Sequence, residues 1–228
     1  MSDPRTFHFQ LPRDGRPPHS PLDERAHPDF HWLTSHRARS RRRDVFEVID
    51  TVVVHATAGF ATAHAIDAWK TRQASAHWVI PDEDEAAHGR FVWATVGEAK
   101  AAYHVANAVD PVPHLGAGPD VNSRSLGIEL VNAQGVNGTQ DPYSDWQVLA
   151  CARIVLYAWA KYPNLRHVIS HAKLDPGRRT DPGPGFPWER FTAMVLSHSA
   201  LPPGVEAPEP PERRAMPPVE QEGNCCGP

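Results

Sequence analysis

Cysteine is scarce in this chain of 228 residues, and long apolar runs are absent. Three cysteines are too few for a disulfide framework. Cys151 lies in an apolar pattern with helical spacing and is predicted to be a core residue, whereas the adjacent Cys225 and Cys226 fit no common metal or redox spacing. No apolar run approaches the roughly 18 residues of a membrane helix, and none lies near the N-terminus. We therefore expect no membrane span, no Sec-type signal, and a protein that is cytoplasmic as synthesised.

Positive charge is not in excess either. The 23 lysines and arginines are outnumbered by 27 aspartates and glutamates, which gives a formal net charge of -4. This charge gives no global reason to bind nucleic acid, and no nucleic-acid partner is predicted. The local exception is "RARSRRR", residues 37–43, which is predicted to be a solvated basic segment rather than a nucleic-acid or lipid-headgroup surface.

Proline, by contrast, is abundant. The 24 prolines are about twice the usual share, and many lie near the two ends. Residues 1–43 show no sustained period and are predicted to form an extended or loosely packed N-terminal arm. Residues 201–228 are Pro-rich and predicted to be disordered. Both arms are candidates for docking to a delivery partner, although tails without a partner fit the composition equally well.

Between the arms, residues 44–200 show the pattern of an α/β domain, with strands and helices intermixed. "TAHAIDAWKTRQ" is an expected helix with Thr62 as a plausible N-cap. Ser144 and Gln147 form a capping-box start for a longer helix that ends near Tyr162, and Pro187 suits the first turn of a last helix. The expected strands are "VFEVIDTVVVHATAG", "SAHWVI", "GRFVWATV", "SLGIELVNA" and "LRHVISH".

Two of these strands deliver a histidine near their ends, His55 and His171. Strand ends beside loops are places where a rigid scaffold presents functional side chains. Asp181 follows His171 by ten residues, in a loop whose prolines and glycines favour an ordered path. Two neutral imidazoles and one carboxylate, with a fourth position open to water, form the ligand set of a catalytic zinc site. Hydrogen-bonded structural histidines fit the same spacing, so the spacing alone leaves both interpretations open.

Glu129 is a single charge in the middle of the expected strand "SLGIELVNA". Alternation places Ile128 and Leu130 on the opposite face, so Glu129 faces either solvent or a cleft. In a cleft, apolar neighbours would raise the pKa of its carboxyl group and suit it to general-base chemistry. The pattern alone does not decide between the two positions.

Read together, five blocks of the sequence resemble the type-2 N-acetylmuramoyl-L-alanine amidases in order and approximate separation. The resemblance covers about residues 45–195, and its last block is highly specific for that family. It implies a central mixed β-sheet flanked by helices, with a zinc groove on one face. The five blocks are "TVVVHATAG", "SAHWVI", "AAYHVANA", "SLGIELVN" and "SHAKLDPGRRTDPGPGFPW".

The resemblance also implies an activity and a set of site residues. The expected reaction is zinc-dependent hydrolysis of the amide bond between the lactyl group of N-acetylmuramic acid and L-alanine, in peptidoglycan or muropeptides. His55, His171 and Asp181 match the three zinc ligands, and Glu129 matches the catalytic glutamate. The implied origin is bacterial or phage.

Two positions depart from the family pattern. Arg179 stands where many members have lysine, and it keeps the positive charge that can stabilise an oxyanion. Ala76 stands where some phage-type members have tyrosine, so that hydroxyl is absent here. His77 and His104 are predicted to contact substrate in the groove, although packing within a strand is the alternative for His77.

The competing interpretation is a recognition module that binds peptidoglycan without cutting it. Such members of the family typically lack a zinc ligand, most often the one at the position of Asp181, and here all three are present. The enzyme is therefore favoured. Whether it acts on intact wall, after non-Sec export or lysis, or on soluble fragments in the cytoplasm is not encoded in any of these motifs.

Overall fold

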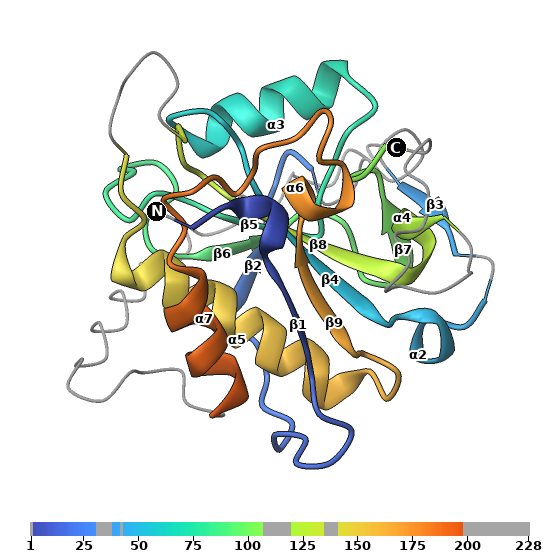
Figure 1. The fold of residues 1–228 in the computed structure, drawn as a ribbon. Coiled ribbons are helices and arrows are strands. Elements are labelled where there is room, and N and C mark those ends of the chain that lie inside the picture. Colours follow the sequence, from blue (N-terminus) through green and yellow to red (C-terminus); the bar gives the residue numbers. More distant parts are fainter. Residues whose placement is uncertain (1, 31–37, 42, 107–119, 135–140, 198–228) are drawn as a thin grey trace, which may run out of the picture.

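The computed structural model describes residues 2–30, 38–41, 43–106, 120–134 and 141–197, and these form a mixed sheet with helices on both faces (Figure 1). Seven strands of the described ranges pair in the order β1-β9-β4-β8-β5-β6-β2. The four central strands β9, β4, β8 and β5 run parallel, whereas β1 and β6 pair antiparallel with β9 and β5. The expected mixed sheet is confirmed. Its strands are β1 (His8–Gln10), β2 (Glu24–Ala26), β4 (Thr51–Ala56), β5 (Trp78–Ile80), β6 (Val92–Ala94), β8 (Ser125–Leu130) and β9 (His167–Ser170).

A small second sheet and several helices complete the described part of the chain. The second sheet pairs β3 (Ala38–Ser40) antiparallel with β7 (Lys100–Ala102). Figure 1 shows α5 and α7 packed together on one side of the large sheet and α3 on the other. The helices are the 3-10 turn η1 (Pro4–Thr6), α2 (Val45–Val48), α3 (Thr62–Thr71), α4 (Val121–Arg124), α5 (Asp145–Lys161), α6 (His171–Leu174) and α7 (Trp188–Leu196).

Alternation along the central strands gives the sheet two different faces. On one face, Val52 and Val54 of β4 and Ile128 of β8 join the main core with α5 and α7. On the other face the same strands present His55 and Glu129, which are direct partners in the parallel register. The apolar core and the polar site are therefore built from alternate residues of the same two strands.

The two long helices begin as their sequences require, but by different means. Helix α5 starts with the expected capping box, in which Ser144 and Gln147 satisfy each other's backbone groups. For α3 the expected N-cap, Thr62, is one residue too late. Ala61 occupies the N-cap position, and its side chain makes no capping hydrogen bond. Instead the carboxylate of Glu85 accepts hydrogen bonds from the backbone N–H and the hydroxyl of Thr62. A distant acidic residue thus caps the first turn of α3.

Residues 2–30 and 38–41 are the described part of the expected N-terminal arm 1–43, and they pack against the rest of the fold instead of lying loosely beside it. Strand β1 pairs with β9, and Phe7, with 2% of its surface exposed, stacks on Trp188 with ring centroids 4.9 Å apart. Arg16 donates to three carbonyl groups at the C-terminal end of α5. A strand of three residues is too short to show a period in the sequence, so only long-range pairing reveals it.

The basic segment is also less solvated than expected. Arg41 donates to the backbone carbonyls of Glu98, Asn122, Ser123 and Ser125. Burial lowers the pKa of its guanidinium group to about 10. Arg41 therefore ties β3 to the α4–β8 junction instead of facing solvent.

Several other expectations are settled only in part. Cys151 is fully buried in the core, as predicted, but Cys225, Cys226 and the tail 201–228 lie outside the described residues. Within the described ranges no helix is long and apolar enough to cross a membrane.

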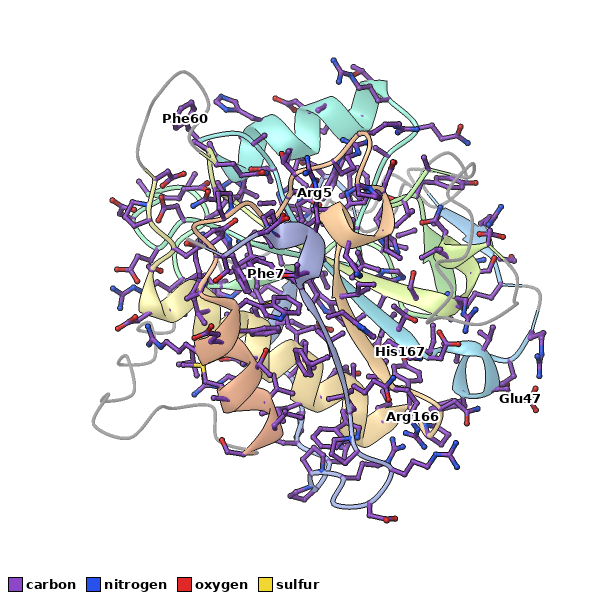
Figure 2. The ribbon with its side chains drawn as sticks, in the orientation of Figure 1. Arg5, Phe7, Glu47, Phe60, Arg166 and His167 are labelled. Atoms are coloured by element: carbon purple, nitrogen blue, oxygen red, sulfur yellow. The ribbon has the colours of Figure 1, made fainter. Side chains whose placement is uncertain are left out.

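Replacing Phe7 with Ala tests whether the N-terminal segment belongs to the folded unit. We expect Phe7→Ala to lower the free energy of unfolding by about 3 to 5 kcal/mol, because it leaves a cavity against Trp188. Phe60→Ala is the matched control, since Phe60 is 53% exposed and lies at the periphery of the molecule (Figure 2); its effect should stay within about 0.5 kcal/mol. Urea unfolding measures both, and equal effects would contradict the packing of the segment around Phe7.

Candidate functional site

A pocket of about 420 Å³ opens at the C-terminal ends of β4 and β8. Its walls bring together residues from five parts of the chain that are far apart in sequence. Parallel strands make this convergence possible, because their carboxyl ends meet at one edge of the sheet. The site residues that line it are His55, His104, Glu129, His171, Arg179 and Asp181.

Three of these side chains meet at one point. The Nδ1 atoms of His55 and His171 lie 2.9 Å apart, and Oδ2 of Asp181 lies 3.3 Å from the first and 3.0 Å from the second. All three residues are buried. The two imidazoles and the carboxylate expected to form a ligand set are thus in contact.

Local structure fixes each member of this cluster. His55 lies near the end of β4, and His171 directly follows β9 as the first residue of α6. The side chain of Ser170 caps α6 by accepting from the N–H of Lys173. The loop with Asp181 is tied back to this helix, because the Ala172 N–H donates to the carbonyl of Asp181. The ordered Pro- and Gly-containing loop therefore delivers Asp181 to the histidines.

The cluster has the dimensions and charge of a zinc site. Ligand atoms held by one tetrahedral zinc at about 2.0 to 2.1 Å lie about 3.3 Å from one another, which is close to the 2.9 to 3.3 Å seen here. Burial and the neighbouring His171 lower the pKa of His55 to about 4, so its imidazole is neutral. Burial alone would raise the pKa of Asp181, but its contacts with His171 and His55 outweigh burial and keep the carboxylate ionised. Neutral imidazoles and an ionised carboxylate are the forms that bind zinc.

Glu129 faces the pocket, not bulk solvent. It is only partly exposed, and it lies beside His55 across the β4–β8 pairing. Burial raises the pKa of Glu129 well above its ordinary value, and the charge of Asp181 raises it further. Arg179 acts in the opposite direction from the exposed rim of the pocket. A carboxyl group with a raised pKa, next to a candidate metal site, is suited to accept and return a proton.

A family model described as N-acetylmuramoyl-L-alanine amidase matches residues 45–184, and all six lining residues named above fall within this range. The chain belongs to this amidase family. The family expected from the five sequence blocks is therefore confirmed.

Individual relatives of the chain agree with this assignment. AmpD of Enterobacter cloacae, a 1,6-anhydro-N-acetylmuramyl-L-alanine amidase, is 37% identical over 79 residues, which are 34% of this chain and 40% of that protein. AmiD of Escherichia coli K12, an N-acetylmuramoyl-L-alanine amidase, is 27% identical over 164 residues, 69% of this chain and 57% of that protein. The crystal structure of AmpDh3 from Pseudomonas aeruginosa matches with a TM-score of 0.58 at 25% identity, over 72% of this chain and 65% of that chain. The match to AmpD thus spans about 40% of that relative's length.

The two histidines expected to contact substrate have different positions in the protein. His77 has no exposed surface and is not part of the pocket wall. Its Nδ1 accepts from the Gly127 N–H and its Nε2 lies 3.1 Å from the carbonyl of Lys100. Its ring therefore packs between strands, which is the alternative that its place in the sequence also allows. His104 does line the pocket, but only 8% of it is exposed.

Several pocket residues of the protein were not singled out from the sequence. They come from the end of α3 and the loop after it, from the segment before His104, and from the loop after β8. Ser75 opens the block "SAHWVI" and Tyr103 lies in the block "AAYHVANA", which were the available signals. The remaining three residues lie outside the five blocks and carry no distinctive spacing. These pocket residues are Trp69, Gln73, Ser75, Tyr103 and Gln134.

The buried histidines predict a pH dependence for the stability of the metal-free protein. Burial lowers the pKa of His55 to about 4 and of His77 to about 3, and that of His104 well below its ordinary value. Unfolding restores values near about 6.5, so below that pH the unfolded chain binds protons that the folded chain does not. The stabilising contribution is present above pH 6.5 and is lost as the pH falls toward 4. Each histidine contributes up to about 1.4 kcal/mol per pH unit.

Urea unfolding at pH 7, 6 and 5 measures this effect. The free energy of unfolding should fall by several kcal/mol over that range. His64→Ala serves as the control, because His64 is exposed on α3 and its removal should leave the slope unchanged. A stability independent of pH between 7 and 5 would show that the three histidines are already charged or exposed.

Proposed function

We propose that the protein is a zinc-dependent amidase that hydrolyses the bond between the lactyl group of N-acetylmuramic acid and L-alanine, in peptidoglycan or muropeptides. The observation that carries this proposal is the contact of His55, His171 and Asp181 beside Glu129 in an open pocket. Membership of the amidase family supports the choice of bond. The presence of all three candidate ligands argues against a module that only binds peptidoglycan.

The candidate ligands would hold zinc through the two Nδ1 atoms and the carboxylate of Asp181. When bound, zinc supplies Lewis-acid polarisation of the scissile carbonyl and makes a water molecule acidic enough to react near neutral pH. Glu129 takes the proton from the attacking water and returns a proton to the leaving amine of L-alanine. Its raised pKa suits both transfers, because a weakly acidic carboxyl group holds the proton between them.

Arg179 would act on the developing negative charge. Arg179 is exposed at the pocket rim, where its guanidinium group is free to contact substrate. A cation near the tetrahedral oxyanion stabilises the transition state more than the neutral substrate. Arg179 is thus a stabilising group rather than a proton donor.

Zinc content and turnover on one preparation test the function. We expect about one zinc per chain and release of free stem peptide, with intact sacculi and a soluble anhydro-muropeptide assayed in parallel. Cleavage of sacculi indicates an enzyme that acts on the wall, and cleavage of the soluble fragment alone indicates recycling. Zinc without cleavage of either substrate would favour a binding module, and no zinc would refute the metal centre.

Glu129→Gln separates metal binding from chemistry. This variant should retain zinc, because Glu129 is outside the ligand set, and should lose about 10² to 10⁴-fold in kcat with the general base removed. Glu189→Gln makes the same change on the exposed surface of α7 and should keep full activity. Comparable turnover in Glu129→Gln and the wild type would contradict the assignment of Glu129 as the general base.

The two neighbouring arginines of the pocket allow a matched test of oxyanion stabilisation. Arg179→Ala should lower kcat by about 10² to 10³-fold, the range for loss of one oxyanion donor, and Arg179→Lys should restore part of it through charge. Arg178→Ala is the control, since its guanidinium group pairs with Asp175. A larger loss in Arg178→Ala than in Arg179→Ala would transfer the role to Arg178.

A further inference from the structure

His104 contacts the metal centre only through another side chain. Its Nδ1 lies 3.0 Å from Nε2 of His55, on the side of that ring away from Asp181. Its Nε2 lies 3.0 Å from the hydroxyl oxygen of Ser125. Both ring nitrogens of the buried His104 therefore have hydrogen-bond partners within the protein, and neither is free to bind substrate.

The proton positions along this chain of contacts follow from one hydroxyl group. The hydroxyl of Ser125 donates its single proton to the carbonyl of Val121, at 2.6 Å. Its oxygen can therefore only accept from His104, which places the proton of His104 on Nε2. Nδ1 of His104 then carries a lone pair and accepts from Nε2–H of His55. The remaining nitrogen of His55, Nδ1, is left unprotonated and faces Asp181 and His171.

We propose that His104, held by Ser125, is a positioning residue that fixes His55 in the tautomer whose Nδ1 can bind the metal. This role rests on the proposed zinc centre. A ligating histidine whose second nitrogen donates to a fixed acceptor keeps its orientation and tautomer, which strengthens metal binding. Here the acceptor is itself an imidazole, and its own proton is fixed by the fold.

The surroundings of His104 are shaped to hold it in this position. Gly127 of β8 makes room for the ring, because a Cβ atom at that position would lie 2.6 Å from Cγ of His104. The side chain of Asn122 accepts from the N–H groups of His104 and Val105 and donates to the carbonyl of Val105. Arg41 in turn binds carbonyls on both sides of the α4–β8 junction that carries Ser125. The ring is thus held by its backbone, by its neighbours and at both nitrogens.

Two amide substitutions distinguish positioning from simple packing. The side-chain oxygen of Asn can replace the acceptor Nδ1, whereas the longer Gln reaches toward Ser125 and leaves His55 without its acceptor. We expect His104→Gln to weaken zinc binding by about 10 to 100-fold, the range for loss of such a partner. His104→Asn should stay within a few-fold of the wild type. Competition with a chromogenic zinc chelator measures the affinities, with no need for turnover.

Nitrogen NMR of the histidine rings in the zinc-free full-length chain gives a second readout that does not depend on metal or on a variant's folding. The expected result is the neutral Nε2–H tautomer for both His55 and His104, and Ser125→Ala should relax this preference. An Nδ1–H tautomer of His104 in the wild type would overturn the proposal, as would equal zinc affinities of the Asn and Gln variants. Absence of zinc on the wild-type chain would instead overturn the metal centre itself and this role with it.

Discussion

A buried carboxylate must be balanced by its surroundings, because an isolated charge in the interior costs several kcal/mol. Asp181 is 7% exposed, and its Oδ2 lies within 3.3 Å of two imidazoles that are themselves buried. The hydrogen bond with His171 stabilises the carboxylate, but a dication at the meeting point of the three side chains would balance its charge more completely. The charge balance of the three side chains therefore favours the same kind of ion, a dication, that their geometry fits.

Convergence of these groups depends on the parallel centre of the sheet. Strands β4, β8 and β9 run in the same direction, so His55, Glu129 and the residue after Ser170 arrive at one edge. Alternation then assigns their even-numbered neighbours in β4 and β8 to the core under α5. A register shift of one residue in β8 would bury Glu129 in that core and expose Ile128 to the pocket. The apolar face thus specifies the register of the site.

The sequence predicted those parts of the molecule in which local pattern and chemistry coincide. The central strands, the capped helix α5 and the block around Asp181 have strong local signals, and their residues occupy the expected elements, except that Val45–Val48 of the first expected strand form the short helix α2. Prediction failed where the determining partner is far away. Strand β1 is defined by pairing with residues about 160 positions later, and Arg41 is buried by carbonyls about 80 positions away. His77 and His104 stand in similar sequence surroundings, and only tertiary contacts distinguish the packing residue from the one beside the pocket.

The composition predicted a peripheral N-terminal arm, but described residues of that arm support the site through hydrogen bonds. The hydroxyl of Ser170 donates to the carbonyl of Pro4, and the N–H of Ser170 donates to that of Phe7, directly before His171. On the opposite side, Arg41 fixes the junction that positions Ser125. Both supports come from residues before the family match begins at residue 45. Because ligand positions must be held to within about 0.5 Å for a functional site, substitutions in this N-terminal region would reach the candidate metal site through two short chains of contacts. The unit that carries the candidate activity is accordingly larger than the segment that carries the family's motifs.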